Sequence, residues 1–413
     1  MRNEGADVRR REFLQACGAV LGLAAVLPLA DASTAQATTT GSGPDQLFQD
    51  GRFAAADRGY ARLLEKDPGD GHAWAQRGYI ALLSNRFGDT EQFLGRAIKL
   101  TPGDTVSMSR LADCYVRQDD FARAVPLLRE SGDRIGATQY GAIAGTPYQI
   151  SGASSTTLPF LTLDPLPSVT AAVNGTKAAF TLDTGATFTF SAALARAAGI
   201  RPVATVLVNH GSGPVPSYIG AVDSLRLGQI EVRNIPVLWD DVSFTTGPAG
   251  VIGTTIFYHF QTTMDYAGRV LSLARTTAAR RAGTKTAPLW LAPDHFLFSE
   301  GSIGKAGPGP VLIDTGGVGL GVVLTKAQAG VAGVVPDYGK PELDFGVTVY
   351  PCTADVAIGA VTRRDMPGVT GPILPPAEFG FGYSGTVSHE FFKPLSVTFD
   401  FTTMTTLIRH PHP

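Results

Sequence analysis

The sequence predicts a multidomain protein in which an N-terminal all-α solenoid of helical repeats precedes an all-β part made of two similar lobes. Helical patterns recur with a period of about 34 residues between residues 44 and 135. Downstream, an Asp-Thr-Gly triplet occurs twice, at Asp183 and at Asp314, and each triplet follows an apolar run typical of a buried strand. The 48 glycines and 28 prolines suit a β protein rich in turns.

The first residues, 1–37, predict a twin-arginine export signal. Arg10 and Arg11 precede an apolar stretch at residues 19–29, and residues 35–37 supply a small-x-small cleavage site. The stretch is short and rich in Gly and Ala, which favours a removable signal over a membrane anchor. We therefore expect an exported protein, periplasmic or secreted, with no stable membrane span after the signal is removed.

Charge and cysteine content limit the partners and cofactors. The net charge is −2, from 34 basic and 36 acidic residues, so electrostatics give no reason to expect nucleic-acid binding. Cys114 and Cys352 fall in different predicted domains, and we interpret them as small buried fillers. The spacing of Cys and His residues offers no metal site. We expect neither a cofactor nor a metal ion.

Residues 44–135 carry the helical period. Two Pro-Gly-Asp turns, at Pro68 and Pro102, stand one period apart, and three phenylalanines share this spacing: Phe53, Phe87 and Phe121. The segment resembles the tetratricopeptide repeats, with about three units. The resemblance implies stacked pairs of antiparallel helices and a concave surface that commonly binds a protein partner. We interpret the aromatic residues as the stacking core of the helices themselves.

The surroundings of the two triplets also repeat. Gly253 lies 70 positions after Asp183, and Gly385 lies 71 positions after Asp314. Each of these glycines opens a short helical turn, and an alternating strand-like segment follows. Two carboxylates built by the same local geometry and held close together cannot both ionise easily, so they share one proton. Such a pair can take a proton from water and give one to a carbonyl oxygen.

This part of the chain resembles the aspartic proteases, in the broad group of pepsin-like and retroviral-type enzymes. The resemblance is carried by residues 169–185, which end in the first triplet, and by an apolar-apolar-Gly motif within residues 249–253. It covers roughly residues 146–410 and implies two lobes, at 146–281 and 282–413. One aspartate from each lobe would meet at the cleft, so a single chain would hold the whole active site.

The resemblance also implies a role for each residue of the triplets. The two aspartates share a proton and hold the attacking water. The threonine hydroxyls form hydrogen bonds across the junction of the lobes, and the glycines leave room for backbone amides to bond the carboxylates, which lowers one pKa. The expected catalytic residues are Asp183 and Asp314, and the expected supporting residues are Thr184, Gly185, Thr315 and Gly316.

Two departures from the family pattern concern the second lobe. The first triplet is followed by Ala186, as in retroviral-type enzymes, but the second is followed by Gly317, which lacks even a methyl group and loosens the loop. By the matched spacing, Ser384 stands where Ile252 stands in the first lobe. We expect weaker packing behind Asp314.

Other polar residues of this part have structural interpretations. Residues 206–214 predict a flap hairpin over the cleft, with a Gly-Ser-Gly tip. His210 is interpreted as an exposed turn residue of this hairpin. Asp265 and Asp400 each end a strand near a turn, and we interpret both as hairpin residues.

Two functions from different classes remain open. The first is an exported aspartic-type endopeptidase that acts on a peptide or protein substrate as a monomer. The second is a catalytically inactive, peptide-binding relative that acts as a periplasmic scaffold. Gly317 and Ser384 slightly favour the second function, whereas the two intact triplets favour the first more strongly. We expect the helical segment to recruit a protein partner and not to be needed for forming the site.

Overall fold

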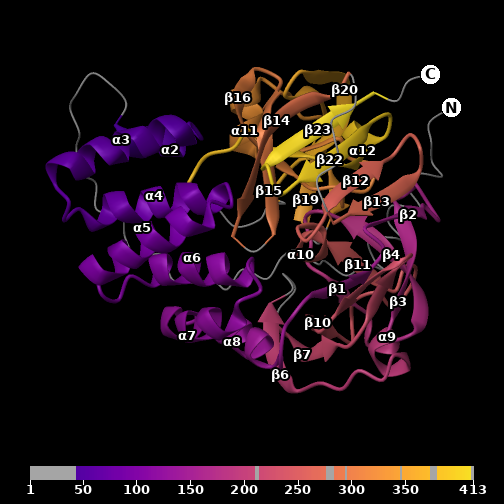
Figure 1. The fold of residues 1–413 in the computed structure, drawn as a ribbon. Helices are drawn as coiled ribbons and strands as arrows, with labels where there is room; N and C mark the ends of the chain where they lie inside the picture. Colours follow the sequence, from indigo (N-terminus) through magenta and orange to yellow (C-terminus); the bar gives the residue numbers. More distant parts are fainter. Residues whose placement is uncertain are drawn as a thin grey trace.

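A computed structural model of the chain describes residues 43–209, 214–275, 283–293, 295–344, 347–372 and 379–410. Helices occupy residues 44–141, and a β-rich part follows, so the predicted order of an all-α segment and a β part is confirmed. Figure 1 shows the helices side by side along one flank of the β-rich part. The predicted signal at residues 1–37 lies outside the described residues.

The helical segment alternates helices with short turns. Its helices are α2 (Pro44–Gln49), α3 (Phe53–Lys66), α4 (Gly71–Leu83), α5 (Phe87–Leu100), α6 (Thr105–Val116), α7 (Phe121–Ser131) and α8 (Arg134–Gly141). The period is visible in the caps: the Asp70 carboxylate accepts a hydrogen bond from Ala73 N at 2.9 Å, and the Asp104 carboxylate accepts one from Ser107 N at 3.0 Å. Helix α8 extends the helical segment beyond the predicted limit at residue 135. Among the described residues, no helix is long and apolar enough to cross a membrane.

The first β lobe is built around a seven-stranded sheet with the order β1-β9-β8-β3-β4-β11-β5. Its strands are β1 (Gln149–Gly152), β3 (Ser168–Val173), β4 (Thr176–Asp183), β5 (Thr189–Phe190), β8 (Leu225–Leu227), β9 (Ile230–Arg233) and β11 (Gly250–Gly253), and its helices are α9 (Ala192–Ala197) and α10 (Thr254–Phe257). Strand β4 carries apolar residues on buried positions and ends at Asp183.

The second lobe repeats this order of elements. Its strands are β15 (Phe296–Ile303), β16 (Ala306–Ile313), β17 (Val322–Leu324), β18 (Glu342–Asp344), β19 (Val347–Ile358), β20 (Val361–Thr370) and β21 (Thr386–Val387), and its helices are α11 (Lys326–Ala332) and α12 (His389–Phe392). Strand β16 leads into Asp314 as β4 leads into Asp183. The loop after each of these strands is therefore placed by a buried strand of its own lobe.

Strand pairing shows which residues of the two lobes correspond. In the first lobe, β11 runs parallel to β4 and places Gly253 opposite Asp183. In the second lobe, β21 runs parallel to β16 and places Val387 opposite Ile313. Because Ile313 immediately precedes the second triplet, Ser388 is the residue that lies beside that triplet.

This register corrects the alignment predicted from the sequence. Val387 corresponds to Ile252, so the prediction that placed Ser384 at this position is wrong. The matched spacing had aligned the wrong glycine, and the true counterpart of Gly253 is Ser388. An apolar residue therefore packs behind the second triplet as it does behind the first.

Six strands join the two lobes in one continuous layer. They are β2 (Ser155–Pro159), β12 (Gln261–Asp265), β13 (Val270–Ala274), β14 (Lys285–Ala292), β22 (Ser396–Asp400) and β23 (Thr405–Arg409). Strands β12 and β22 pair antiparallel at the centre, where the hydroxyls of Thr263 and Thr398 lie 2.7 Å apart. Asp265 and Asp400 each accept hydrogen bonds from amides of the following turn, which is a structural role.

Each lobe also carries a hairpin beyond its Asp-Thr-Gly loop. In the first lobe, β6 (Ala204–Asn209) pairs with β7 (Pro214–Val222), and β7 also pairs with β10 (Ile235–Asp240). The predicted flap tip at residues 210–213, with His210, lies outside the described residues. In the second lobe, β18 and β19 form a hairpin that the sequence did not indicate.

The helical segment shares its hydrophobic core with the β part. The Phe53 ring lies 5.0 Å from the ring of Trp290 and 5.0 Å from that of Phe381, measured between centroids. Phe121 packs against Tyr148, at the start of the first lobe. Phe53 also packs on Phe48 and Phe121 on Tyr140, so the expected packing within the helices is present, but both rings are shared with the β part. Each buried aromatic ring contributes about 1.5–3 kcal/mol by leaving water.

Polar contacts join the helices to both lobes as well. Asp119, after α6, lies 3.1 Å from His259 Nε2 in the first lobe. Arg117 is buried and donates a hydrogen bond to the Leu291 carbonyl of the second lobe at 3.0 Å. Helix α8 packs Ile135 against the hydrophobic cluster of the β6–β7 hairpin. The helical segment therefore links the lobes to each other, an arrangement that the independent recruiting domain of the sequence prediction did not include.

Candidate active site

Two loops meet where β4 and β16 end, and each presents one carboxyl group. Asp183 Oδ1 accepts a hydrogen bond from Gly185 N at 2.7 Å, and Asp314 Oδ1 accepts one from Gly316 N at 2.9 Å. The same geometry therefore holds both side chains. The two carboxyl groups lie close enough that each changes the pKa of the other.

The glycines of the triplets are required by the closeness of the two loops. A Cβ atom on Gly185 would lie 2.6 Å from Asp314 Cγ, and a Cβ atom on Gly316 would lie 2.2 Å from Asp183 Oδ2. Both distances are far below van der Waals contact. Each glycine therefore lies directly against the carboxyl group of the opposite lobe.

The threonines of the triplets bind the two loops to each other. The Thr184 amide donates to Thr315 Oγ1 at 3.0 Å, and the Thr315 amide donates to Thr184 Oγ1 at 3.1 Å. The Thr184 hydroxyl in turn donates to the Ile313 carbonyl at 2.9 Å. Both threonine side chains are fully buried, so these reciprocal bonds are protected from water.

Burial and mutual repulsion change the acidity of the pair. Burial raises the pKa of Asp183 well above its ordinary value, the Asp314 charge raises it further, and the Gly185 amide opposes both effects. Burial also raises the pKa of Asp314, against the lowering effects of the Gly316 amide and the bond with Asp183. The pair therefore retains one proton at a pH where two isolated aspartates would both be ionised.

A serine that the sequence alignment missed supports the second loop. Ser388 Oγ accepts a hydrogen bond from Gly317 N at 2.9 Å and donates one to the Asp314 carbonyl. A Cβ atom on Gly317 would lie 2.4 Å from Ser388 Oγ, so the small residue makes room for the serine. The first lobe has the reverse pair, Ala186 beside Gly253. The expected loosening at Gly317 is therefore compensated by Ser388, and the strand register was the missing information.

A histidine of the second lobe reaches the first catalytic loop. His295 is 1% exposed, and its Nε2 lies 3.1 Å from the Gly185 carbonyl oxygen. It occupies the short turn between β14 and β15. The turn has no periodic pattern in the sequence, so nothing there had marked His295 as part of the site.

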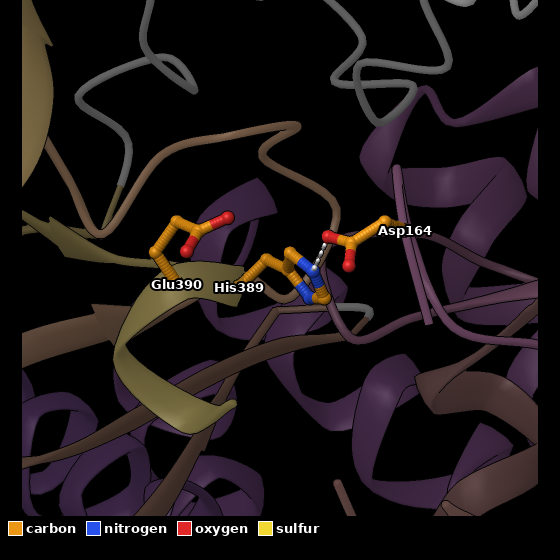
Figure 2. Close-up of side chains that lie close together, drawn as sticks. All are labelled: Asp164, His389 and Glu390. Atoms are coloured by element: carbon orange, nitrogen blue, oxygen red, sulfur yellow. Dashed lines mark ion pairs between the residues drawn. The ribbon is translucent and has the colours of Figure 1, made fainter. Parts of the chain in front are cut away.

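A second group of titratable side chains joins the lobes next to the Asp314 loop. Asp164, in the connection between β2 and β3, faces His389 and Glu390 of α12, with ligand atoms all within 4.8 Å of one another. Figure 2 shows the His389 ring directed at the Asp164 carboxylate, and Nε2 lies 3.7 Å from Oδ1. Burial lowers the pKa of His389 to about 4.

Carboxylate and imidazole groups such as these can bind a divalent cation, but a lysine side chain already supplies a positive charge here. The Lys393 ammonium lies 2.5 Å from Asp164 Oδ1 and also pairs with Glu390. The group therefore acts as an ion-pair network between the lobes.

Comparisons with known proteins agree with this geometry. Residues 169–256 match the family model for aspartyl protease. No curated protein matches the chain. The match lies in the first lobe and includes the Asp183 loop. It supports an aspartic protease domain in this chain.

Solved structures also match the chain over short lengths. A retropepsin-like aspartic protease from Rickettsia conorii is 17% identical, with a TM-score of 0.24, over 33% of this chain and 100% of that chain. A mutant O-GlcNAc transferase from Thermobaculum terrenum is 20% identical, with a TM-score of 0.21, over 24% of this chain and 19% of that chain. The chain thus spans about a fifth of the length of that transferase.

Proposed function

We propose that the chain is an aspartic endopeptidase that hydrolyses peptide bonds with a water molecule activated by Asp183 and Asp314. The observation that carries this proposal is the pair of buried carboxyl groups, each held by the amide of its own loop and each lying against the glycine of the opposite loop. Among the described residues, no basic side chain pairs with either carboxyl group, so the pair is not a simple structural salt bridge. The family match to residues 169–256 supports the same class of enzyme.

In this mechanism, the singly protonated pair is the competent form. The ionised carboxylate accepts a proton from the attacking water, and the protonated carboxyl group donates its proton to the oxygen of the scissile carbonyl. The water oxygen forms a bond to the carbonyl carbon, which gives a neutral tetrahedral diol. Breakdown of the diol breaks the C–N bond, and a carboxyl proton passes to the leaving nitrogen.

The inactive, peptide-binding alternative is less well supported. It rested on a loosened second loop at Gly317 and on Ser384 in place of an apolar residue. Ser388 fills the space beside Gly317 and bonds the Asp314 loop, and Val387 supplies the apolar residue. These contacts support the first function over the inactive alternative.

The proposal includes three further expectations that come from the sequence. The active unit is one chain, because both aspartates belong to it. The protein is exported, because residues 10–37 have the pattern of a twin-arginine signal. The helical segment binds a protein partner, because its 34-residue period is typical of segments that do so.

A peptide-library digest tests the proposed function. The full chain is incubated with a mixed peptide library between pH 3 and pH 8, and new termini are identified by mass spectrometry. We expect cleavage at internal peptide bonds by the wild-type protein and none by the Asp183→Asn or Asp314→Asn variants. Cleavage that persists in either variant would contradict the assignment of the pair.

A further inference from the structure

His295 belongs to the second lobe and forms a hydrogen bond to the Asp183 loop of the first lobe. It directly precedes β15, and Leu297 of this strand pairs with Ile313, the residue before Asp314. Its Nε2 atom lies 3.1 Å from the carbonyl oxygen of Gly185, in the loop of the other aspartate. A short path of backbone and one side chain therefore joins the two catalytic loops.

We infer that His295 is a positioning residue that sets the separation of the Asp183 and Asp314 carboxyl groups. The inference rests on the proposed function and adds a residue to its machinery. Gly185 receives the His295 bond at its carbonyl, while its amide holds the Asp183 carboxylate at 2.7 Å. Loss of the His295 bond frees the peptide unit that follows Gly185, and the Asp183 side chain moves with it.

The protonation state of His295 suits this role. A carbonyl oxygen only accepts hydrogen bonds, so Nε2 carries the ring proton in the neutral imidazole. Burial lowers the pKa of His295 to about 4, which keeps the ring neutral at pH values well above 4. The ring also packs against Phe296 in a tilted arrangement, with 4.3 Å between centroids. The donor is therefore held in one orientation.

The restraint acts on the Asp183 loop alone. The turn of the first lobe that corresponds to the His295 turn is the connection between β2 and β3, and it holds Asp164. That residue crosses to the other lobe too, but it faces His389 and Lys393 rather than the Gly316 carbonyl. The two threonines hold both loops equally, so His295 is an additional link on one side.

The separation of two carboxyl groups can be measured by titration. Repulsion between close carboxylates separates the two macroscopic pKa values of the pair, and a greater distance brings these values together. Tyr266 is a further titratable group near the pair, and burial together with the aspartate charges raises its pKa, so it stays neutral. The difference between the two macroscopic pKa values of the pair therefore depends on the distance between the two carboxyl groups.

The test compares His295→Leu and His295→Gln in the full chain. Glutamine keeps an N–H donor at nearly the reach of Nε2, whereas leucine removes it and keeps the bulk. The matched control is His259→Gln, which alters a partly buried histidine whose partner, Asp119, belongs to the helical segment. Carbon-13 titration of labelled aspartates gives the two macroscopic pKa values without turnover, and kcat, KM and Tm are measured beside it.

We expect His295→Leu to narrow the gap between the two pKa values by about one unit. It should also lower kcat about tenfold with KM changed less than about twofold, because the groups that react are misplaced. His295→Gln and His259→Gln should keep the wild-type gap and kcat. A wild-type gap in His295→Leu, or equal losses in both His295 variants that follow their Tm, would overturn the inference.

The outcome is distinguishable from failure of the proposed function. If the wild-type protein cleaves no peptide but its aspartates titrate as a coupled pair, the proposed function fails while the titration still decides the role of His295. If the wild-type aspartates titrate independently, the carboxyl groups are not a pair, and the inference is overturned along with the proposed function.

Discussion

At the scale of single residues, Gly185 and Gly316 each lie directly against the carboxyl group of the opposite lobe. A side chain at either position would occupy the space of the opposite carboxyl group. The closeness forces the two aspartates to share a proton, because burial and repulsion penalise two charges. The glycine amides stabilise the carboxylate, as a basic side chain could, and the absent glycine side chains leave room for it. The amides carry no charge, so the negative charge of the pair is not neutralised.

The first prediction concerns the pair itself. Asp183→Asn and Asp314→Asn should each lower peptide cleavage about 10³-fold or more, because acid–base transfer requires both groups. Each substitution also removes a carboxyl group whose folded-state pKa is raised, and so relieves repulsion at neutral pH. We therefore expect the Tm at pH 7 to rise in both variants. A calorimetric scan that shows a lower Tm, with native circular dichroism, would contradict the repulsion argument.

The second prediction concerns the residue pair that supports the Asp314 loop. Gly317→Ala should destabilise the protein by about 1–3 kcal/mol, because its Cβ atom would meet Ser388 Oγ at 2.4 Å. Ser388→Gly should cost about 1–3 kcal/mol through the lost hydroxyl bonds. The double variant recreates the first-lobe pair of Ala186 and Gly253, so we expect a recovery of about 1 kcal/mol or more.

Urea denaturation of the four proteins completes this double-mutant cycle. The wild-type protein, each single variant and the double variant are compared at one pH and one temperature. Additive losses would mean that Gly317 and Ser388 do not share the space that the structure gives them.

At the scale of elements, some of the site follows from the sequence and some does not. The strands that end at Asp183 and Asp314 could be predicted, since each is a continuous apolar run closed by the same triplet. The partner strand of the second lobe could not, because Thr386-Val387-Ser388 lacks the apolar-apolar-Gly pattern of the first lobe. Only backbone pairing reveals that Ser388 replaces a glycine.

The turn that carries His295 is a second feature that could not be predicted from the sequence. Short connections have no periodicity, so their residues are placed by the strands on either side rather than by a local pattern.

The partners of the aromatic residues in the helical segment are a third feature that the sequence did not predict. Phe53 has the same spacing whether it packs on its own helices or on Trp290, so the period alone predicts helices but not their partner surface.

The third prediction concerns the turn between β14 and β15. Burial lowers the folded-state pKa of His295 to about 4, whereas an unfolded histidine has a pKa of about 6.5. Between these values the unfolded chain binds a proton that the folded chain does not bind. The stability contributed by the neutral, bonded histidine is therefore complete above about pH 6.5 and is lost as the pH falls towards 4, by up to about 3 kcal/mol.

The free energies of unfolding of wild type and His295→Gln, measured by urea at several pH values, isolate this effect. The raised pKa values of the aspartates act in the opposite direction in both proteins, so they cancel in the difference. Wild type should lose stability relative to the variant on acidification. A difference that is constant from pH 7.5 to pH 4.5 would show that His295 binds a proton equally in both states.

At the scale of the whole molecule, one chain supplies both Asp-Thr-Gly loops. The central strands β12 and β22 pair within the chain, and the helical segment contacts both lobes. The fourth prediction is that specific activity does not change on dilution from about 10 μM to 10 nM, a range in which a micromolar dimer would dissociate. Activity that falls with concentration, together with a dimer in sedimentation analysis, would contradict a single-chain site.

The last prediction concerns the helical segment as a structural part of the β lobes. A chain that begins at residue 144 would expose Trp290, Phe298 and Phe381, which are covered by the first helices, and would leave His259 without Asp119. Exposed apolar surface of this extent favours aggregation. We therefore expect the truncated chain to be insoluble or to bind a hydrophobic dye, and to cleave peptides poorly.

Supplying the missing part as a separate chain distinguishes a structural role from a purely recruiting one. When residues 43–143 are co-expressed with residues 144–413, the aromatic contacts of Phe53 and the Arg117 bond to Leu291 can form again. Solubility and cleavage of a short fluorogenic peptide should then return together. A truncated chain that is soluble alone and cleaves this peptide at the full rate would instead show that the lobes are complete without the helices, in spite of the core they share.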